Sequence, residues 1–538
     1  MSAQTFLIGL DYGSESARGV LIDAKSGAQV ASHVHPYRHG IMTQALADGT
    51  ALPPAWALQD AADYAEAAAD ILSRLGQGRH VTGIGLGFTA SSPLPATAEG
   101  APLSRLFPAE PHAFVKLWKH AAAQPFAAAI NRAGGDFLAH FGGRVSGEWL
   151  LPKAAQLAAE APALWQRTER FIEAGDWLVW QLTSQERRSL GLAAYKAQYD
   201  GRHGYPAHLV PGLAERLAPP WPVGTPAGGL SAEWRARTGI LGPATVAVAV
   251  IDSHVVLPAV GGVGSGTLVS ALGTSAVHLY LAETFKPLPP GIEGVARDGS
   301  IPGLWCYEAG QAGFGDMLAW LVRTFPRGPD LAASFAAYNA GAVLLRPGES
   351  HLVALDWWSG NRVPLADSTL SGVLAGLTLG TTAAGVYRAL MEAACYGARR
   401  VVELLEAGGL AIERVILTSG LARENPLLVQ LMADVLARPV AVPDIAHGTA
   451  VGAAIHGAVA GGLVADYAEG GRRFGARTST SYAPDPAASA VYHDLYAGYR
   501  ALAEDAIVQA SLRALNPIAA RASQPLATPP LPTGRDPL

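Results

Sequence analysis

Residues 246–281, VAVAVIDSHVVLPAVGGVGSGTLVSALGTSAVHLYL, decide the fold expected for this chain. The apolar run VAVAVI stops at Asp252, and a second run, LVSAL, ends at Gly273-Thr274-Ser275 before AVHLYL continues. The pattern predicts a buried strand with a carboxylate at its end, a glycine-rich hinge, and a strand–turn–strand unit. A base on one side of a hinge and a turn that could hold a phosphate on the other suit a two-lobed kinase. The alternative is a core strand followed by a linker.

Length and composition favour a folded α/β enzyme of two large or three smaller domains. The chain has 538 residues, half of them hydrophobic, with 61 Gly and 38 Pro. A net charge of -5 gives no reason to expect a nucleic-acid partner. Two cysteines, Cys306 and Cys395, give neither a disulfide framework nor a zinc site, which favours a reducing cytoplasm. We expect no signal peptide and no membrane span, because the longest apolar run is broken at Asp252 and His254.

A first strand–turn–strand unit is predicted at residues 6–23, FLIGLDYGSESARGVLID. Gly13 permits a tight turn, and the hydroxyls of Ser14 and Ser16 can donate hydrogen bonds to an anion. Asp11, at the end of the first strand, could hold a magnesium ion through water. An ordinary hairpin with a solvated aspartate would give the same pattern.

The same design recurs at residues 267–281, which predicts a duplicated domain whose two hairpins face one cleft. A third element, RVILTSGLARENPLLVQLMADVLAR at 414–438, reads as a strand, a Ser-Gly turn and a helix. Asn425 is a good N-cap, and Pro426 suits the first helical position. The N-terminus of this helix can face a nucleotide, although a normally capped crossover has the same sequence.

The order of hairpin, VIDSH, second hairpin and SGLARENP resembles the FGGY family of carbohydrate kinases over about residues 5–505. The segment at 372–392, GVLAGLTLGTTAAGVYRALME, is similar to the second signature of that family but departs from it at Gly385. The resemblance implies an α/β fold with two lobes, of the ribonuclease H-like type shared by sugar kinases, actin and heat-shock ATPases. It implies duplicated core domains at 1–262, with the sugar pocket and the first phosphate hairpin, and at 263–505, with the ATP site.

Six further segments resemble the branch of the family that phosphorylates L-ribulose at O5. They are HAFVKLWKHAAAQ (112–124), GEWLLPKAAQL (147–157), FIEAGDWLVWQLT (171–183), AAYKAQY (193–199), YEAGQAGFGDMLAWL (307–321) and ALDWWSGNR (354–362). The resemblance therefore implies ATP-dependent phosphorylation of L-ribulose in arabinose breakdown. A kinase for another pentulose or pentitol, and a sugar-binding protein that keeps the fold without turnover, remain alternatives.

The resemblance assigns Asp252 as the general base that accepts the sugar hydroxyl proton. Trp118, Lys196 and Glu308 would join Asp252 in the sugar pocket, through an indole N–H, an ammonium and a carboxylate. Ala90 would line the same pocket. Each has a structural alternative: a cap or ion pair for Asp252, a core position for Trp118, a surface position for Lys196 and a buried ion pair for Glu308.

The cofactors implied are ATP and Mg²⁺, with Asp11 and Asp252 as the candidate metal-binding residues. Asn425 is a candidate nucleotide contact, but its sequence context favours a helix cap. The resemblance places the remaining ATP contacts on the two hairpins and the Ser-Gly turn: Asp11, Gly13, Ser14, Ser16, Arg18, Gly273, Thr274, Ser275, Gly420 and Leu421.

Three departures from the family pattern leave these groups in place. Gly87 stands where an aspartate is usual, which bears on substrate choice, and Ser419 and Ser253 replace smaller residues. Residues 516–538, rich in Pro, Ala and Ser, predict a disordered tail. We expect a pentulose and ATP as partners, and a homodimer is compatible with the sequence.

Overall fold

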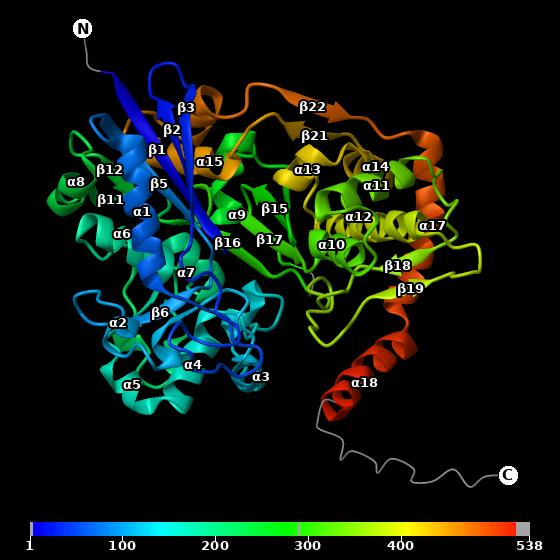
Figure 1. The fold of residues 1–538 in the computed structure, drawn as a ribbon, viewed down its shortest axis with the longest axis horizontal. Helices are drawn as coiled ribbons and strands as arrows, with labels where there is room; N and C mark the ends of the chain where they lie inside the picture. Colours follow the sequence, from blue (N-terminus) through cyan, green and yellow to red (C-terminus); the bar gives the residue numbers. More distant parts are fainter. Residues whose placement is uncertain (1–3, 289–290, 523–538) are drawn as a thin grey trace.

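The computed structural model describes residues 4–288 and 291–522 (Figure 1). Two seven-stranded sheets form its framework, one from each half of the chain. The first contains β1 (Thr5–Tyr12), β2 (Ser16–Asp23), β3 (Gln29–Pro36), β5 (His80–Phe88), β11 (Pro226–Gly229), β12 (Thr245–Ala247) and β13 (Val250–Ile251). The second contains β14 (Thr267–Leu272), β15 (Ala276–Ala282), β16 (Gly294–Arg297), β17 (Trp305–Gln311), β20 (Arg414–Thr418), β21 (Val440–Pro443) and β22 (Ser479–Tyr482).

The two sheets share one topology. In the first, β3, β2 and β1 pair antiparallel, β5 and β12 continue in parallel, and β11 returns antiparallel. In the second, β17, β15 and β14 pair antiparallel, β20 and β21 continue in parallel, and β22 returns antiparallel. The duplication predicted from the two hairpins is confirmed at the level of strand order.

Short strand pairs and helices complete both halves. The pairs are β4 (Leu58–Gln59) with β7 (Val115–Lys116), β6 (Pro93–Ala96) with β8 (Arg170–Glu173), β9 (Arg188–Ser189) with β10 (Pro220–Trp221), and β18 (Val353–Leu355) with β19 (Val373–Ala375). Helices of the first half are α1 (Ala61–Gly76), α2 (Leu103–Leu106), α3 (Gln124–Ala133), α4 (Leu150–Glu160), α5 (Pro162–Arg167), α6 (Ala174–Thr183), α7 (Leu190–Lys196), α8 (Ala232–Thr238) and α9 (Asp252–Val255). Those of the second are α10 (Phe314–Thr324), α11 (Leu331–Val343), α12 (Ala383–Ala407), α13 (Gly420–Glu424), α14 (Pro426–Leu436), α15 (Gly448–Ala460), α16 (Tyr467–Phe474), α17 (Pro486–Glu504) and α18 (Ala506–Ala522).

Helix α15 comes late in the sequence yet packs on the first sheet. Its residues Ala450, Ala453 and Ala454 belong to the hydrophobic core of that sheet, as do Tyr467 and Phe474 of α16. In Figure 1 the orange α15 lies beside the blue β1. A segment that follows the predicted division at residue 262 therefore completes the core of the first half.

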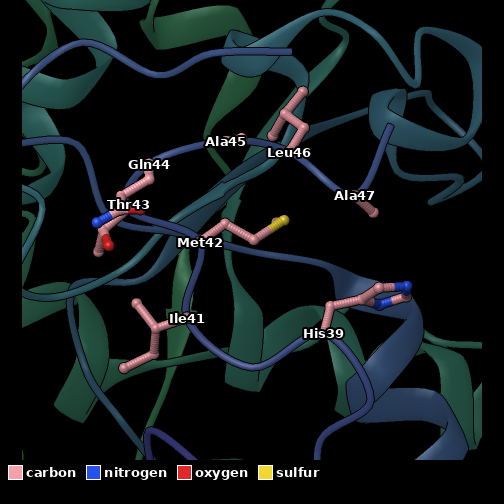
Figure 2. Close-up of a pocket in the computed structure, with 8 residues that line it drawn as sticks. All are labelled: His39, Ile41, Met42, Thr43, Gln44, Ala45, Leu46 and Ala47. Carbon is pink, nitrogen blue, oxygen red and sulfur yellow. The ribbon is translucent and has the colours of Figure 1, made fainter. Parts of the chain in front are cut away.

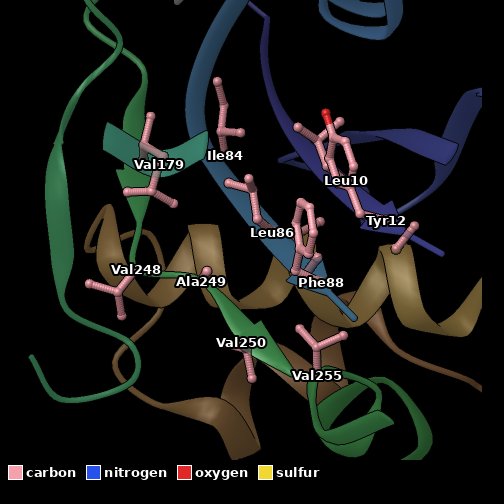
Figure 3. Packing of buried hydrophobic residues seen from close by; sticks show 14 of the residues in the cluster. Leu10, Tyr12, Ile84, Leu86, Phe88, Val179, Val248, Ala249, Val250 and Val255 are labelled. Carbon is pink, nitrogen blue, oxygen red and sulfur yellow. The ribbon is translucent and has the colours of Figure 1, made fainter. Parts of the chain in front are cut away.

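Glycines allow this helix to approach the strands closely. A Cβ atom at Gly9 of β1 would overlap the carbonyl oxygen of Ala450, and one at Gly85 of β5 would overlap that of Ala453. Figure 3 shows the core at this end of the sheet, where Leu86 and Phe88 lie between β1 and β13. Close packing here holds the ends of three strands rigidly, and these ends carry the site described below.

The C-terminal region departs from the prediction. Helix α18 continues through residue 522, so the first seven residues of the predicted disordered tail are helical. The remainder of that tail, 523–538, lies outside the described residues. Among the helices of the described ranges, none combines the length and apolarity needed to span a bilayer.

Candidate functional site

Two carboxylates flank the end of the central strand β5. Asp11 of β1 lies in register with Gly87 of β5, and Val250 of β13 pairs with the same glycine from the other side. Asp252 follows β13 directly and starts α9. A Cβ atom at Gly87 would lie 2.8 Å from Cγ1 of Val255 and 3.6 Å from Cα of Asp252. The missing side chain at residue 87 therefore borders the predicted base, and Val255 occupies the space that a side chain would need.

The environment of this carboxylate pair favours the neutral forms. Burial, aided by the charge of Asp11, raises the pKa of Asp252 to about 7. Burial raises the pKa of Asp11 to about 6, although the Arg18 guanidinium, 3.7 Å away, opposes this. A carboxylate whose pKa lies near the working pH is suited to act as a general base.

Lys196 and Glu308, both predicted to line the sugar pocket, meet across the two halves of the chain. Lys196 Nζ lies 2.6 Å from Oε1 of Glu308, and His254 Nε2 lies 2.9 Å from Oε2. The other ring nitrogen of His254 contacts the Ser300 hydroxyl at 2.5 Å. Burial alone would raise the pKa of Glu308, but Lys196 and His254 hold it well below its usual range. The buried ion pair considered as an alternative for Glu308 is thus present, and it adjoins Asp252 through His254.

The first hairpin contacts the predicted sugar side directly. The indole N–H of Trp118 donates to the Ser14 hydroxyl at 2.9 Å, and the Gln59 amide donates to the Ser14 carbonyl. The turn itself is closed by a hydrogen bond from Gly13 N to the Ser16 carbonyl. A candidate sugar contact and a candidate phosphate contact therefore touch each other, as they must if phosphoryl transfer takes place between them.

The second hairpin is held by a helix. The amide of Gly315, in the first turn of α10, donates to the carbonyls of Gly273 and Thr274, and Asp316 N also donates to Thr274. Gly273 and Thr274 are exposed, whereas β14 and β15 on either side are largely buried. The turn that carries Gly273, Thr274 and Ser275 is thus anchored through its carbonyls.

The Ser-Gly turn after β20 lies at the same sheet edge as this hairpin. Strands β14 and β20 are parallel, with Ala271 opposite Thr418, so both turns follow at their carboxyl ends. Ser419 has a φ of 79°, a region that favours glycine. Gly420 and Leu421 then start α13. Asn425 caps α14 by accepting from Leu428 N at 3.1 Å, and its amide nitrogen lies 3.3 Å from Asn339 Oδ1, so both ends of this amide already have protein partners.

Positive charge gathers between the two halves near the first hairpin. Burial, with the charges of Arg18 and Arg423, lowers the pKa of His447. Arg423 also donates to the Ile445 carbonyl, just before α15. Arg18 is a predicted phosphate contact, whereas no role was predicted for Arg423. In the sequence, Arg423 is only one residue of the quoted segment SGLARENP, and nothing there indicates that it lies near Arg18.

The Arg362 guanidinium also bridges the two halves of the chain, close to the predicted sugar pocket. Arg362 Nη2 lies 3.3 Å from Glu148, and its Nε lies 3.6 Å from Glu293. The arginine fills the space over Gly310, which is two residues beyond Glu308 in β17 and so on the same face of the sheet. Glu148 and Arg362 lie in segments quoted for the resemblance, whereas Glu293 does not, and the pairing of the three could not be read from the sequence.

A separate surface pocket of about 310 Å³ is formed by residues 39–47 (Figure 2). Its lining includes His39, Met42, Gln44 and Leu46. None of the predicted site residues contributes to it, and it is open rather than enclosed.

The residues present fit a magnesium ion held largely through water and phosphate oxygens. Two carboxylates with raised pKa values lie at one sheet edge, and a divalent cation would relieve the repulsion between their charges. Within the described ranges, no group of three or more His, Cys, Asp or Glu side chains forms a closed metal cage. Mg²⁺ keeps much of its hydration shell and usually needs only one or two carboxylates from the protein.

The chain was compared with known proteins. Residues 268–461 match the C-terminal domain of the FGGY family of carbohydrate kinases. The chain is 39% identical to a ribulokinase of Halalkalibacterium halodurans, with 92% of this chain and 93% of the relative covered. It is 38% identical to a ribulokinase of Mycolicibacterium smegmatis, with 92% and 93% covered.

Solved structures agree on the fold. A xylulose kinase from Brucella ovis superposes with a TM-score of 0.80 at 20% identity, covering 95% of this chain and all of the other. A glycerol kinase from Plasmodium falciparum gives 0.76 at 13%, covering 92% and 97%. The fold is the two-lobed α/β fold of sugar kinases, as predicted. Both the long match to the ribulokinases and the shared strand order lead to one conclusion: the chain belongs to the FGGY family of carbohydrate kinases.

Proposed function

We propose that this protein transfers the γ-phosphoryl group of ATP to O5 of L-ribulose, with Asp252 as the general base. The observation that carries the proposal is the position of Asp252. It follows β13 beside Asp11, and its near neighbour His254 binds Glu308 of the Lys196–Glu308 pair. The ribulokinases that resemble this chain over more than nine-tenths of its length support the choice of sugar.

Each group has a role in the proposed reaction. Lys196 and Glu308 orient the hydroxyls of the sugar, and Trp118 sets its position against the first hairpin. The Asp252 carboxylate accepts the O5 proton as the phosphoryl group arrives, which typically contributes about 10²- to 10⁴-fold in rate. Magnesium bound near Asp11 and Asp252 would neutralise charge on the transferring phosphoryl group.

The two halves of the site come from different lobes, so their approach excludes water and limits ATP hydrolysis. The turns around Ser14 and Thr274 would hold the phosphates of ATP, with Gly420 and Leu421 near its base and ribose. Thr274 and Gly420 are exposed and Ser14 is half-buried, and these small residues would let a ligand approach the backbone.

The experiment is an ADP-release assay with L-ribulose, D-ribulose, xylulose and ribitol, run on the native chain and on Asp252→Asn. We expect the highest kcat/KM with L-ribulose. The variant should lose at least about 10²-fold in kcat while still binding ATP. Residual turnover above about a tenth of the native value would refute the role of Asp252. A higher kcat/KM with another sugar would refute L-ribulose as the substrate. Inactivity with all four sugars would refute the kinase proposal.

A further inference from the structure

The ammonium group of Lys153 is completely buried and bonded only to backbone carbonyls among the hydrogen bonds of the described residues. Its Nζ lies 2.6 Å from the Ser91 carbonyl, 2.8 Å from that of Leu117 and 3.2 Å from that of Lys116. An ammonium has three N–H donors, so all three are directed at protein oxygens. These carbonyls belong to two chain segments that are far apart in sequence.

Both segments carry a candidate sugar contact. Ser91 directly follows Ala90, and Leu117 directly precedes Trp118. Ala90 lies two residues beyond the end of β5, the strand flanked by Asp11 and Asp252, while Trp118 donates to Ser14 of the first hairpin. Lys153 therefore links the two loops that would form one side of the sugar pocket.

The backbone at Ser91 requires such support. Its φ is 63°, in the left-handed region that costs a non-glycine residue roughly 1 kcal/mol or more. The Ser91 hydroxyl donates to the Glu148 carbonyl at 2.5 Å, and Ser92 N donates to the Glu173 carboxylate at 2.8 Å. A conformation held by several partners at a site edge is the pattern found where geometry serves function.

We propose that Lys153 is a positioning residue that holds the Ala90 and Trp118 loops in the arrangement that binds the sugar. The inference rests on the proposed function, because both loops are assigned to the sugar pocket there. Lys153 acts through these backbone carbonyls and does not touch the substrate. Its loss removes a donor from three buried carbonyls, of which that of Leu117 keeps the His120 amide as a partner, and frees Ser91 to leave its strained conformation.

Lys116 provides a matched control. It too is fully buried, and it lies in the same part of the fold. Lys116 lies on the Trp118 segment, but its ammonium contacts only His112 Nδ1 at 3.1 Å and the Trp56 ring at 4.5 Å among the contacts of the described residues. Lys116→Met therefore keeps the backbone carbonyl that Lys153 contacts and removes no bond to the Ser91 segment. Methionine at either site removes a buried ammonium while keeping most of the side-chain volume.

The test compares Lys153→Met and Lys116→Met by steady-state kinetics with L-ribulose and ATP varied separately. We expect Lys153→Met to lower kcat/KM for L-ribulose by about 10- to 100-fold while the KM for ATP changes less than about two-fold. Lys116→Met should lose thermal stability but keep its KM for L-ribulose. Should Lys153→Met fail to fold, Lys153→Gln, which retains two N–H donors, is measured against the same criterion.

Unchanged KM and kcat for the sugar in the Lys153 variant would overturn the inference, as would equal sugar effects in both variants. If the native chain prefers another pentulose, the comparison is made with that sugar. Inactivity of the native chain with every sugar would instead refute the proposed function, and this inference with it, so the two failures are distinguishable.

Discussion

Asp252 and Asp11 show how a residue's chemistry depends on its neighbours. Neither carboxylate has an unusual sequence context, yet burial at one strand end raises the pKa of both. The charge of one opposes ionisation of the other. At neutral pH such a pair carries less negative charge than two solvated aspartates would, and it is the base form of Asp252 that the proposed reaction needs.

The pKa of Asp252 should respond to Asp11. In the ligand-free and metal-free chain, Asp252 should titrate near pH 7, so its carboxylate fraction falls as the pH drops below 7. Asp11→Asn removes a negative charge, which makes ionisation of Asp252 easier and moves its pKa to lower pH. Carbon-13 NMR of labelled aspartate measures the shift. Asp48→Asn, at an exposed site, is the control. An unchanged Asp252 pKa in Asp11→Asn would contradict the coupling.

Helix α15 packs against strand β5 at a distance that only glycine in the strand permits. The helix backbone approaches the strand so closely that a methyl group at Gly85 would overlap the Ala453 carbonyl. The segment GIGLGF at 83–88 gave no sign of this packing in the sequence. A glycine that lies against a helix cannot be distinguished by sequence from a glycine that forms a turn. The contact is long-range, and the partner lies more than 300 residues away in sequence.

Gly85→Ala should therefore destabilise the first lobe. The added methyl group meets backbone atoms that cannot move aside, so we expect a loss of about 1–3 kcal/mol or more. Gly264→Ala is the matched change, since a Cβ there meets no described atom within 4 Å. Its effect should stay within about 0.5 kcal/mol. Scanning calorimetry of both variants checks this, and equal unfolding temperatures would show that the close approach does not matter.

At the scale of the whole molecule, an ion pair joins the two lobes close to the predicted sugar pocket. Arg362 from the second half contacts Glu148 from the first and Glu293 from its own half. Arg144 also donates to the Ala366 carbonyl across the same boundary, at 3.0 Å. The charged groups are partly exposed, so water and salt weaken these pairs.

Removing the cross-lobe charge should shift the lobes toward a more open arrangement by a modest amount. A partly exposed pair is worth about 0.2–1 kcal/mol, which changes a two-state population by up to about five-fold. Glu148→Gln should therefore raise the radius of gyration of the ligand-free chain in small-angle scattering and raise the KM for the sugar by no more than about five-fold. Arg346→Ala, which breaks an exposed pair within the second half, is the control. High salt should likewise raise the radius of gyration of the native chain. Superimposable scattering curves for the native chain and Glu148→Gln would show that the Arg362–Glu148 pair does not hold the lobes together.

The predicted strand–turn–strand units, the cap at Asn425 and the carboxylate after VAVAVI all appear in the structure, because each depends on residues close together in sequence. The resemblance placed Lys196 and Glu308 in one pocket, and the structure brings them together in a 2.6 Å ion pair, which is the structural alternative named for Glu308. Their role at a sugar stays a prediction. The division at residue 262 stays a prediction, and no local pattern indicated that residues of α15 and α16 pack in the first core. The placement of the ATP contacts and of magnesium stays a prediction.

The sequence alone determined the kind of fold and the position of the strand-end aspartate proposed as the base, because alternating apolar runs, turn residues and an aspartate after a strand are local signals that burial and backbone geometry translate directly. Tertiary structure decided the partners: His254 on Glu308, Lys153 on the carbonyls of Ser91 and Leu117, and Arg362 between the lobes. Such contacts join segments tens to hundreds of residues apart. Their energies depend on burial and distance, which exist only once the sheets have packed.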